Sequence, residues 1–499
     1  MFSALLLAWY DRCGRVLPFR GTKDPYRIWV SEIMLQQTRT ETVGAYYARF
    51  LSRFPDVFAL AAAPEEDVLK CWEGLGYYSR ARNLHRAARE VAEKYHGRFP
   101  ADPVLLRALP GIGDYTAAAV ASIAFDLPVP AVDGNLTRVL ARFHGVREDV
   151  GQPSVKRRLD ALARQDMPPV RCGDFNQALM DLGATVCVPG TPDCPRCPLR
   201  ALCDACAQGD ADALPVKAAA KPPREIPLAV AIVTCHGRVW MEQRTETLLK
   251  GLWVYQLTEG CERRADAEKQ MAALGIRAAC REELGHARHV FTHRVWQMTL
   301  FHYAAETEAC RAGRFFTRRE MDALPIPTAM KAARAEAERL LTPRVLPASG
   351  ALLPQAAAAY AAGWADSHAA HCSPAFLKKH SPGHMEETLR THLAHGRGVY
   401  ALQIAGETAG VLVLSPQDNE VTALYVRPEE QGLGIGKAAM AFAVDALDKK
   451  RPMKVTVLTR NEKAKGLYAA FGFTRIGETR ILDAARDVAE CDLYRPPEP

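Results

Sequence analysis

The sequence predicts a multidomain chain in which an all-α N-terminal part is followed by two α/β parts. Three observations predict this: the length of 499 residues, a change from helical to strand-like spacing of apolar residues near residue 228, and two Pro-containing breaks. A chain of this length exceeds one hydrophobic core, because single cores stop growing at about 250–300 residues. The hydrophobic fraction of 48% and the charged fraction of 24% are typical of folded proteins and exclude a disordered chain.

The net charge of +7 is compatible with nucleic-acid binding without establishing it. No apolar run reaches the roughly 18 residues of a membrane span. The apolar start, Met1 to Leu7, follows no basic residues and is soon interrupted by Asp11-Arg12, so we expect an amphipathic first helix and no signal peptide. Most of the fourteen cysteines are scattered, which excludes a secreted disulfide framework and favours a cytoplasmic protein.

Residues 1–206 are predicted to form helices joined by short turns. Apolar residues recur at helical spacing in Trp29 to Leu35, Val68 to Trp72, Leu84 to Val91 and Leu136 to Phe143. Residues 207–227 are rich in Ala, Pro and Lys without an apolar period, which predicts a linker.

Residues 228–341 and 342–499 are predicted to form two α/β parts, separated by a short linker at 342–347. In the first, strands are expected at Leu228 to Val233, Val239 to Met241 and Val295 to Tyr303, with a turn at His236-Gly237. In the second, strands are expected at Tyr400 to Ile404, Gly410 to Leu414 and Glu420 to Val426, followed by a glycine loop and a helix.

Four cysteines, Cys187, Cys194, Cys197 and Cys203, follow the spacing C-x6-C-x2-C-x5-C. Thiolates this close in the chain can wrap one small metal centre without a distant ligand. Zinc bound by four cysteines is the common alternative. The spacing alone leaves both open, although the long first gap differs from the paired knuckles of zinc ribbons. Cys206 lies just outside the pattern and is interpreted as a spare thiol.

Three segments carry the candidate chemistry of the helical part. LPGIGDYT (109–116) is a glycine-bearing turn before an Ala-rich helix, where backbone N–H groups favour an anion. Asp133 lies on a turn before another helix, and taken alone it is better interpreted as an N-cap. Glu32 is a single acid in the apolar helical turn WVSEIMLQQT (29–38). Burial would raise the pKa of its carboxyl and suit a general acid, whereas a solvent-facing Glu is the ordinary alternative.

Together and in this order, these motifs resemble the endonuclease III superfamily of base-excision glycosylases, and within it the MutY branch. The matching segments are WVSEIMLQQT, GLGYYSRARNL (74–84), LPGIGDYTA, VDGN and FNQALMDLGA (175–184), and the resemblance covers essentially all of residues 1–206. It implies a [4Fe–4S] cluster on the four cysteines. It also implies that the substrate is double-stranded DNA in which adenine is mispaired with 8-oxoguanine or guanine.

The resemblance implies a role for each matching residue. Glu32 would protonate adenine, and Asp133 would stabilise the cationic sugar that forms when the N-glycosidic bond breaks. Tyr115 stands where lyase-competent relatives carry a Schiff-base lysine, so we expect no strand cleavage; it would also orient Asp133. Phe19 stands where the family usually has Trp. The remaining DNA- or base-binding residues would be Arg15 and Gln177 at the adenine pocket, Gln37 and Tyr77 as wedges for the flipped base, and Gly111 and Gly113 in the hairpin.

Residues 228–341 weakly resemble the Nudix-like domain with which MutY proteins read 8-oxoguanine. The landmarks are Gly251-Leu252-Trp253 and VFTH (290–293), in which Thr292 and His293 would contact DNA. REELG (281–285) superficially resembles a Nudix box. The glycine and glutamate expected upstream of it are missing, so we expect no nucleotide hydrolysis.

The third part contains VRPEEQGLGIGK (426–437), which resembles the pyrophosphate-binding turn of GNAT acetyltransferases. NEKAKGLYAAFGF (461–473) matches the second signature of that family. The resemblance implies an acetyl-CoA site with Tyr468 as the proton donor to the departing thiolate. The acetyl-CoA-binding residues would be Gln431, Gly432, Gly434, Gly436, Lys437 and Asn461.

The predicted fold is therefore an all-α helix-hairpin-helix glycosylase with an Fe–S cluster loop, then a Nudix-like α/β domain, then a GNAT α/β domain. We expect a monomer that does not contact membranes, associates with the nucleoid when it acts on DNA, and acetylates an acceptor that the sequence does not identify. Two alternatives stay open at this point: a zinc-bearing DNA-binding module at the front, and a catalytically inactive interaction module at the tail.

Overall fold

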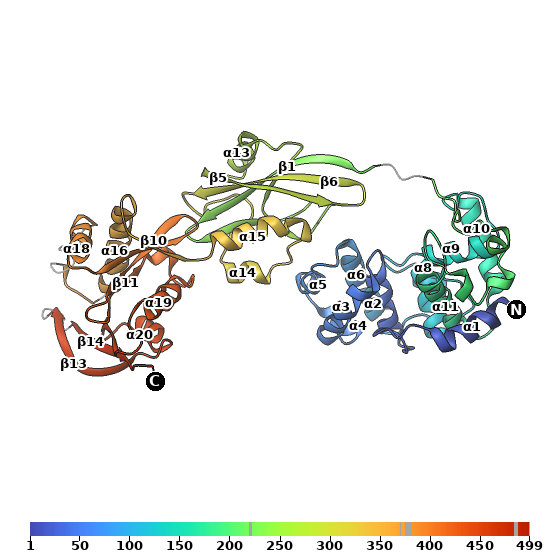
Figure 1. The fold of residues 1–499 in the computed structure, drawn as a ribbon, viewed down its shortest axis with the longest axis horizontal. Coiled ribbons are helices and arrows are strands. Elements are labelled where there is room, and N and C mark those ends of the chain that lie inside the picture. The colour runs from blue at the N-terminus through green and yellow to red at the C-terminus, as the bar shows by residue number, and fades with distance from the viewer. Residues whose placement is uncertain (219–221, 370, 375–381, 484–487, 499) are drawn as a thin grey trace. The chain divides into compact units, whose positions relative to one another are not determined.

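The computed structural model describes residues 1–218, 222–369, 371–374, 382–483 and 488–498 (Figure 1). These residues form two compact units. The first contains Met1–Pro222, Arg244–Leu252 and Leu324–Thr328, and the second contains Pro223–Gln243, Trp253–Ala323 and Ala329–Pro499. Residues 219–221 of the predicted linker lie outside the described residues.

The first unit is helical, as the apolar spacing predicts. Its α-helices are α1 (Phe2–Cys13), α2 (Pro25–Leu35), α3 (Thr40–Arg53), α4 (Val57–Ala62), α5 (Glu65–Cys71), α6 (Ser79–Lys94), α7 (Pro103–Arg107), α8 (Asp114–Phe125), α9 (Gly134–Phe143), α10 (Pro153–Asp166), α11 (Cys172–Thr185) and α12 (Asp204–Gln208). Short 3-10 turns, η1 (Cys194–Arg196) and η2 (Arg200–Leu202), lie between the cysteines. The helices α2, α4, α7 and α9 each begin at an aspartate whose carboxylate accepts backbone N–H groups.

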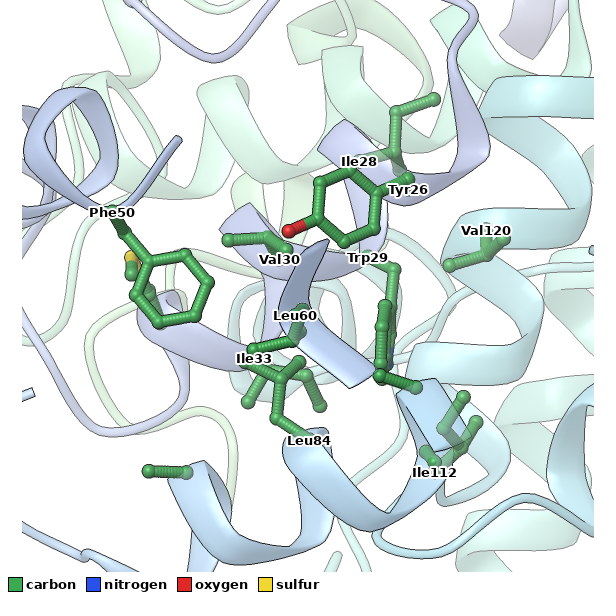
Figure 2. Packing of buried hydrophobic residues seen from close by; sticks show 14 of the residues in the cluster. Tyr26, Ile28, Trp29, Val30, Ile33, Phe50, Leu60, Leu84, Ile112 and Val120 are labelled. Atoms are coloured by element: carbon green, nitrogen blue, oxygen red, sulfur yellow. The ribbon is translucent and has the colours of Figure 1, made fainter. Parts of the chain in front are cut away.

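Helix α2 passes through the main core of this unit. Trp29 of α2 is fully buried in a core that also contains Phe50 of α3, Leu84 of α6 and Val120 of α8 (Figure 2). Seven consecutive residues of α2, from Ile28 to Met34, are buried. Any polar side chain in this stretch is therefore removed from bulk water, which sets the conditions for Glu32.

The predicted linker is ordered over its first half. Helix α12 continues to Gln208, the side chain of Leu214 is 4% exposed, and the N–H of Val150 donates to the carbonyl of Val216 at 3.0 Å. One buried leucine and a few backbone hydrogen bonds hold the segment against the helices. Neither feature produces a periodic apolar pattern, so the sequence does not reveal this order.

The second unit contains two mixed sheets. The first sheet comprises β1 (Arg224–Cys235), β2 (Arg238–Gln243), β3 (Trp253–Val254), β4 (Gln256–Glu259), β5 (Ala278–Val290), β6 (Arg294–Ala305) and β7 (Arg314–Phe316). Its main path is β3-β2-β1-β6-β5, with β1 and β6 parallel. Helix α13 (Arg264–Ala273) lies on one face, and α14 (Arg318–Ala323) and α15 (Lys331–Leu340) lie on the other (Figure 1). The predicted strands and the turn at His236-Gly237 are confirmed.

The second sheet has the order β13-β14-β12-β11-β10-β9-β8. Its strands are β8 (Arg344–Pro347), β9 (Gly398–Ile404), β10 (Glu407–Ser415), β11 (Glu420–Val426), β12 (Met453–Leu458), β13 (Thr474–Asp483) and β14 (Val488–Arg495). The helices α16 (Leu352–Ala369) and α18 (Pro382–Ala394) cover one face, and α19 (Ile435–Ala446) and α20 (Glu462–Ala469) cover the other. Alternating residues of β10 serve the two faces, with Val411 packing on the first pair of helices and Leu412 on the second.

The break predicted at 342–347 differs from the structure. Residues Arg344–Pro347 form the edge strand β8, which pairs with β9 over four residues. A strand of four residues that ends in proline is too short to show the alternation of apolar and polar residues typical of a strand. It is ordered by its pairing with β9. Among the described residues, none of the helices combines the length and the apolarity of a membrane-spanning segment.

Candidate active sites

A pocket of about 720 Å³ in the helical unit gathers most of the residues predicted for base excision. Its lining comes from the loop after α1, from α2, and from the starts of α6, α8 and α9. The predicted residues in the lining are Arg15, Glu32, Gln37, Tyr77, Gly113, Tyr115, Asp133 and Gln177, joined by Phe19. The lining contains three carboxyl groups: Asp114 is 83% exposed and pairs with Arg107, whereas those of Glu32 and Asp133 are more shielded and belong to separate helices.

Glu32 lies on α2 and is 6% exposed. Burial raises the pKa of its carboxyl to about 6, with the hydrogen bond from Tyr115 opposing the shift. The guanidinium of Arg80 donates to the carbonyls of Ile33 at 2.9 Å and Met34 at 3.0 Å, so it holds the last turn of α2 in place. Glu32 is therefore a fixed, desolvated carboxyl that keeps a proton up to nearly neutral pH.

Tyr115 contacts Glu32 across the pocket. Its hydroxyl donates to Glu32 Oε2 at 2.6 Å, whereas the resemblance implied that it would orient Asp133. The reason is the packing of two helices: Gly113 is the N-cap of α8, so Tyr115 lies in the first turn of α8, against α2. Burial raises the pKa of Tyr115 well above its ordinary value, so the hydroxyl stays a donor.

Asp133 is both a helix cap and a pocket residue. Its Oδ1 accepts from the N–H of Leu136 at 2.7 Å, and its Oδ2 accepts from the side-chain amide of Asn135 at 3.1 Å. Burial raises the pKa of Asp133, and these N–H donors oppose that shift by stabilising the carboxylate. The two shielded carboxyl groups of the pocket therefore differ in kind, since Glu32 has one hydroxyl partner and Asp133 has several N–H partners.

Asp181 and Arg20 form a network that the sequence did not single out. Asp181 is fully buried and accepts from Arg20 at 2.6 and 2.8 Å and from Arg15 at 2.7 Å. Burial raises the pKa of Asp181, but the two guanidinium groups outweigh it and hold the pKa below its ordinary range. Arg15 is thus anchored at the pocket edge, and the charge of Arg20 lowers the pKa of Glu32. The one sequence feature that could have indicated a role for Asp181 is its place inside the matched segment FNQALMDLGA.

The two predicted wedge residues share an unusual backbone. Gln37 and Tyr77 both have left-handed backbone angles, with φ values of +58° and +47°. Such conformations cost about 1–3 kcal/mol in non-glycine residues and cluster at ligand-binding positions. Tyr77 is 47% exposed, and the guanidinium carbon of Arg80 lies 5.5 Å from the centre of its ring. Both residues also line the pocket.

The two hairpin glycines differ in their surroundings. Gly111 has a φ of +76°, and an added Cβ would lie 2.5 Å from Cβ of Asn83, so a side chain is excluded. A Cβ at Gly113 would meet no atom within 4 Å, which leaves the start of α8 open to approach. Gly111 lies outside the pocket lining. Gln177 donates to the carbonyl of Gly173 at 3.4 Å and borders the pocket.

The predicted metal-ligating cysteines line a second, small cavity, and Cys206 joins them. The lining cysteines are Cys187, Cys194, Cys197, Cys203 and Cys206. Arg142 of α9 is 1% exposed and donates to the Cys187 sulfur at 3.3 Å, to the carbonyl of Val188 at 2.8 Å and to that of Gly190 at 2.8 Å. Within the described part of the chain, no three His, Cys, Asp or Glu side chains converge closely enough to hold a single metal ion.

Arg142 links the cysteine loop to the pocket through α9. This helix begins at Asp133 and carries Arg138, whose guanidinium donates to the Cys187 carbonyl at 2.8 Å and to the Gly183 carbonyl at 2.6 Å. Both arginines were missed by the sequence analysis, because their partners lie some fifty residues away with no local pattern. The cysteine loop therefore supports the same helix that positions the catalytic carboxylate candidate.

The predicted DNA contacts of the second unit lie at a hairpin tip. Thr292 and His293 are exposed in the turn between β5 and β6. The carbonyl of His293 accepts from the N–H of Arg224 at the start of β1. The REELG fragment, residues 281–285, lies within β5, so its two glutamates are on a strand.

The glycine loop of the second sheet lies at the end of β11, where that strand leaves its neighbour. Strands β11 and β12 pair in parallel at two positions only, from Glu420 and Val421, so their carboxyl ends separate. Gly432 and Gly434 have φ values of +84° and +85°, and an added Cβ on either would meet nothing within 4 Å. Gly434 is the N-cap of α19. The loop thus presents open backbone N–H groups at a helix start, an arrangement that favours a phosphate.

The other predicted acetyl-CoA residues surround this loop. Gln431 donates to Asp366 at 3.0 Å and accepts from Lys463 at 2.5 Å, so its amide is held in place. Lys437 is exposed in the first turn of α19. An added Cβ on Gly436 would lie 3.1 Å from Leu467, which lets α19 and α20 approach closely.

Asn461 and Tyr468 come from the second predicted signature, on α20. Asn461 caps α20 by accepting the N–H of Ala464 at 3.0 Å, so the structure gives it a helix-capping role. Tyr468 is 6% exposed, and burial raises the pKa of its hydroxyl to about 12, which keeps it protonated.

Comparison with known proteins agrees with this geometry. The family model described as HhH-GPD superfamily base excision DNA repair protein matches residues 30–165, the NUDIX domain matches residues 229–336, and the acetyltransferase (GNAT) domain matches residues 365–488. The predicted order of a helix-hairpin-helix domain, a Nudix-like domain and a GNAT domain is confirmed.

Individual relatives extend across the first two of these domains. The adenine DNA glycosylase of Mus musculus is 36% identical over 394 residues, covering 66% of this chain and 76% of that protein. The adenine DNA glycosylase of Homo sapiens is 34% identical, covering 66% and 72% respectively. Among solved structures, a thermostable thymine-DNA glycosylase is 32% identical and covers 42% of this chain and 95% of its own, with a TM-score of 0.38. By its similarity to these curated relatives, the chain belongs to the adenine DNA glycosylase family.

Proposed function

We propose that the helical unit excises adenine mispaired with 8-oxoguanine or guanine from double-stranded DNA. The observation that carries this proposal is the pairing of two unlike carboxyl groups in one pocket. Glu32 is desolvated with a pKa of about 6, whereas Asp133 accepts N–H donors that oppose the rise of its pKa on burial. Two carboxyl groups whose surroundings differ in this way suit an acid and a cation stabiliser.

The reaction follows from these two roles. Glu32 donates its proton to a ring nitrogen of the flipped adenine, which turns the base into a better leaving group. The N-glycosidic bond then breaks and its electron pair leaves with the base, while the carboxylate of Asp133 stabilises the positive sugar. Water adds to the sugar carbon and loses a proton, which leaves free adenine and an abasic site.

The same pocket supports a monofunctional enzyme. Strand cleavage through a Schiff base needs an amine, and none of the described residues that line the pocket is a lysine. Tyr115, which stands at the lyase position, instead donates to Glu32.

An excision assay tests the proposal directly. Duplexes with adenine opposite 8-oxoguanine, guanine or thymine are incubated with the protein, and the products are resolved with and without alkali. We expect cleavage after alkali for the first two mispairs and little for the thymine pair. Efficient nicking without alkali or heat would contradict the monofunctional mechanism, and equal excision from all three duplexes would contradict the mispair specificity.

We also propose that Cys187, Cys194, Cys197 and Cys203 hold a [4Fe–4S] cluster. The support is that the four side chains line one small cavity. Four cysteine thiolates are the usual ligand set of a [4Fe–4S] cluster. The N–H group that Arg142 directs at the Cys187 sulfur suits a thiolate ligand.

For the tail, we propose an acetyl-CoA-dependent N-acetyltransferase. The open N–H groups at Gly432 and Gly434 would bind the pyrophosphate, and the protonated hydroxyl of Tyr468 would supply a proton to the departing CoA thiolate after an amine takes the acetyl group. Titration calorimetry of the full chain with acetyl-CoA tests binding. If no heat of binding is observed, the tail is an interaction module with a GNAT fold.

A further inference from the structure

Within the second unit, a turn of the Nudix-like domain packs on the glycine loop of the GNAT domain. The β1–β2 turn comprises residues 235–238, and the glycine loop comprises residues 427–434. Nδ1 of His236 lies 3.0 Å from Oε1 of Glu430. Glu430 is 2% exposed, and its Oε2 has no hydrogen-bond partner among the described residues. Since burial raises the pKa of Glu430 and His236 opposes that shift, the imidazole is the contact that favours its charged form.

Two further contacts join the same turn and loop. Arg238 donates to the backbone carbonyl of Glu429 at 3.3 Å. Gly237 has a φ of +66°, and a Cβ added to it would lie 2.6 Å from a terminal carbon of Leu433 and 2.9 Å from one of Ile404. Leu433 is the residue between the two open glycines of the loop. The turn therefore contacts the glycine loop by two hydrogen bonds and by close packing.

The two open glycines leave the last part of the glycine loop with few restraints of its own. Gly432 and Gly434 meet no neighbouring atoms at their Cβ positions, whereas the preceding Gln431 is held by Asp366, Lys463 and the carbonyl of Val426. A glycine backbone loses more entropy than any other when it is ordered, so an outside support at this place has a large effect. A buried carboxylate that loses its hydrogen-bond partner becomes strongly unfavourable and tends to move toward water.

We propose that the β1–β2 turn is part of the acetyl-CoA site, with His236 as a positioning residue that holds the glycine loop in its binding conformation. This inference rests on the acetyl-CoA binding proposed above. It means that the Nudix-like domain completes the acetyl-CoA site, and that residues 342–499 alone lack the partner of Glu430. Acetyl-CoA affinity would then depend on a domain that the resemblance assigns to DNA recognition.

Titration of the full chain with acetyl-CoA tests the inference. His236→Ala should weaken binding about tenfold, the usual consequence of leaving a buried group unsatisfied. His236→Gln keeps an N–H donor toward Glu430 and should stay within a few-fold of wild type. The matched control is His286→Ala, which removes a histidine that is exposed on β5 and lies 3.4 Å from Glu283. It should bind as wild type does.

A double variant separates positioning from unfolding. In His236→Ala combined with Glu430→Gln, no buried charge is left unpaired, so most of the lost affinity should return. Thermal unfolding of each variant should match wild type. Equal affinities of wild type and His236→Ala would overturn the inference while acetyl-CoA binding stands, and so would a double variant as weak as the single one. If wild type does not bind acetyl-CoA, the proposed function and this inference both fail.

Discussion

The pocket of the helical unit and the glycine loop of the second unit obtain their geometry in opposite ways. In the pocket, the reactive groups are side chains, and other side chains fix them: Tyr115 donates to Glu32, and Asn135 donates to Asp133. In the glycine loop, the groups proposed to bind acetyl-CoA are backbone N–H groups, and Gly432 and Gly434 carry no side chain that would cover them. A single side-chain change should therefore abolish chemistry in the pocket, whereas the loop should fail when its shape is changed.

The strongest test of this difference is Glu32→Gln. An amide cannot supply a proton to adenine, and general acid catalysis contributes about 10²- to 10⁴-fold in rate. We expect single-turnover excision to fall by that factor while binding to the mispaired duplex persists. Glu90→Gln, which changes the same residue type on the surface of α6, should keep the wild-type rate. A Glu32→Gln rate within a few-fold of wild type would show that another group is the acid.

The corresponding test of the loop is Gly434→Glu. The residue has a φ of +85°, so a side chain adds strain of about 1–3 kcal/mol, and its carboxylate repels a pyrophosphate. We expect acetyl-CoA binding to weaken about a hundredfold or more, because each 1.4 kcal/mol is a factor of ten. Adenine excision should not change. Gly406→Glu adds the same charge at another positive φ with open space and should leave binding intact, so equal loss in both variants would argue against a local effect.

Cys197→Ser tests the support that the cysteine loop gives to the pocket. Loss of one ligand should remove iron and the visible absorbance of the cluster. Arg138 and Arg142 would then lose a fixed loop to bind, which would disturb α9 and with it Asp133. We expect DNA binding to weaken about tenfold, the range found when a single supporting interaction of a metal site is lost.

The matched control for this variant is Cys206→Ser, which should keep iron because that thiol lies outside the ligand spacing. Acetyl-CoA binding should be unchanged in both variants. Stoichiometric zinc in wild type purified with and without oxygen would contradict the cluster assignment.

The contrast between the two sites also shows what the sequence predicts and what it leaves out. Local patterns predicted six of the strands from residue 228 onward and the hairpin turn before α8, because each depends on neighbouring residues in the chain. The partner of Tyr115 was not predicted. The sequence places Tyr115 in the first turn of α8, just after Gly113, but the contact of its hydroxyl with Glu32 depends on how α8 packs on α2. Long-range pairs such as Arg15 with Asp181 leave no period in the sequence.

Domain boundaries show the same distinction. The composition of residues 342–347 predicts a short linker between the two α/β parts. The segment is instead ordered by pairing with β9, a strand more than fifty residues further along. The contact between His236 and Glu430 likewise joins residues on both sides of the predicted break. Composition describes a segment in isolation, so it carries no information about a partner that the fold brings to it.

The smallest expected effect concerns the proton on Glu32, and Tyr115→Phe measures it. The hydroxyl of Tyr115 lowers the pKa of Glu32, against the burial that raises it to about 6. Removing the hydroxyl should therefore raise this pKa further. Because excision needs the protonated acid, the rate falls as pH rises through the pKa, and this falling limb should move to higher pH in the variant. A hydrogen bond worth about 1 kcal/mol corresponds to about 0.7 pH units at about 1.36 kcal/mol per unit.

Single-turnover excision measured across the pH range gives the position of this limb. The plateau rate should fall only a few-fold, because Glu32 stays buried and fixed by α2. Tyr95→Phe, at the end of α6, removes a hydroxyl elsewhere in the same unit and should leave the limb where it is. If the limb of Tyr115→Phe moves to lower pH or does not move, the hydroxyl does not act on the proton of Glu32. Tyr115 would then act only by filling space in the pocket, much as the glycines act only on the shape of the loop. The contrast between the two sites would be weaker than proposed.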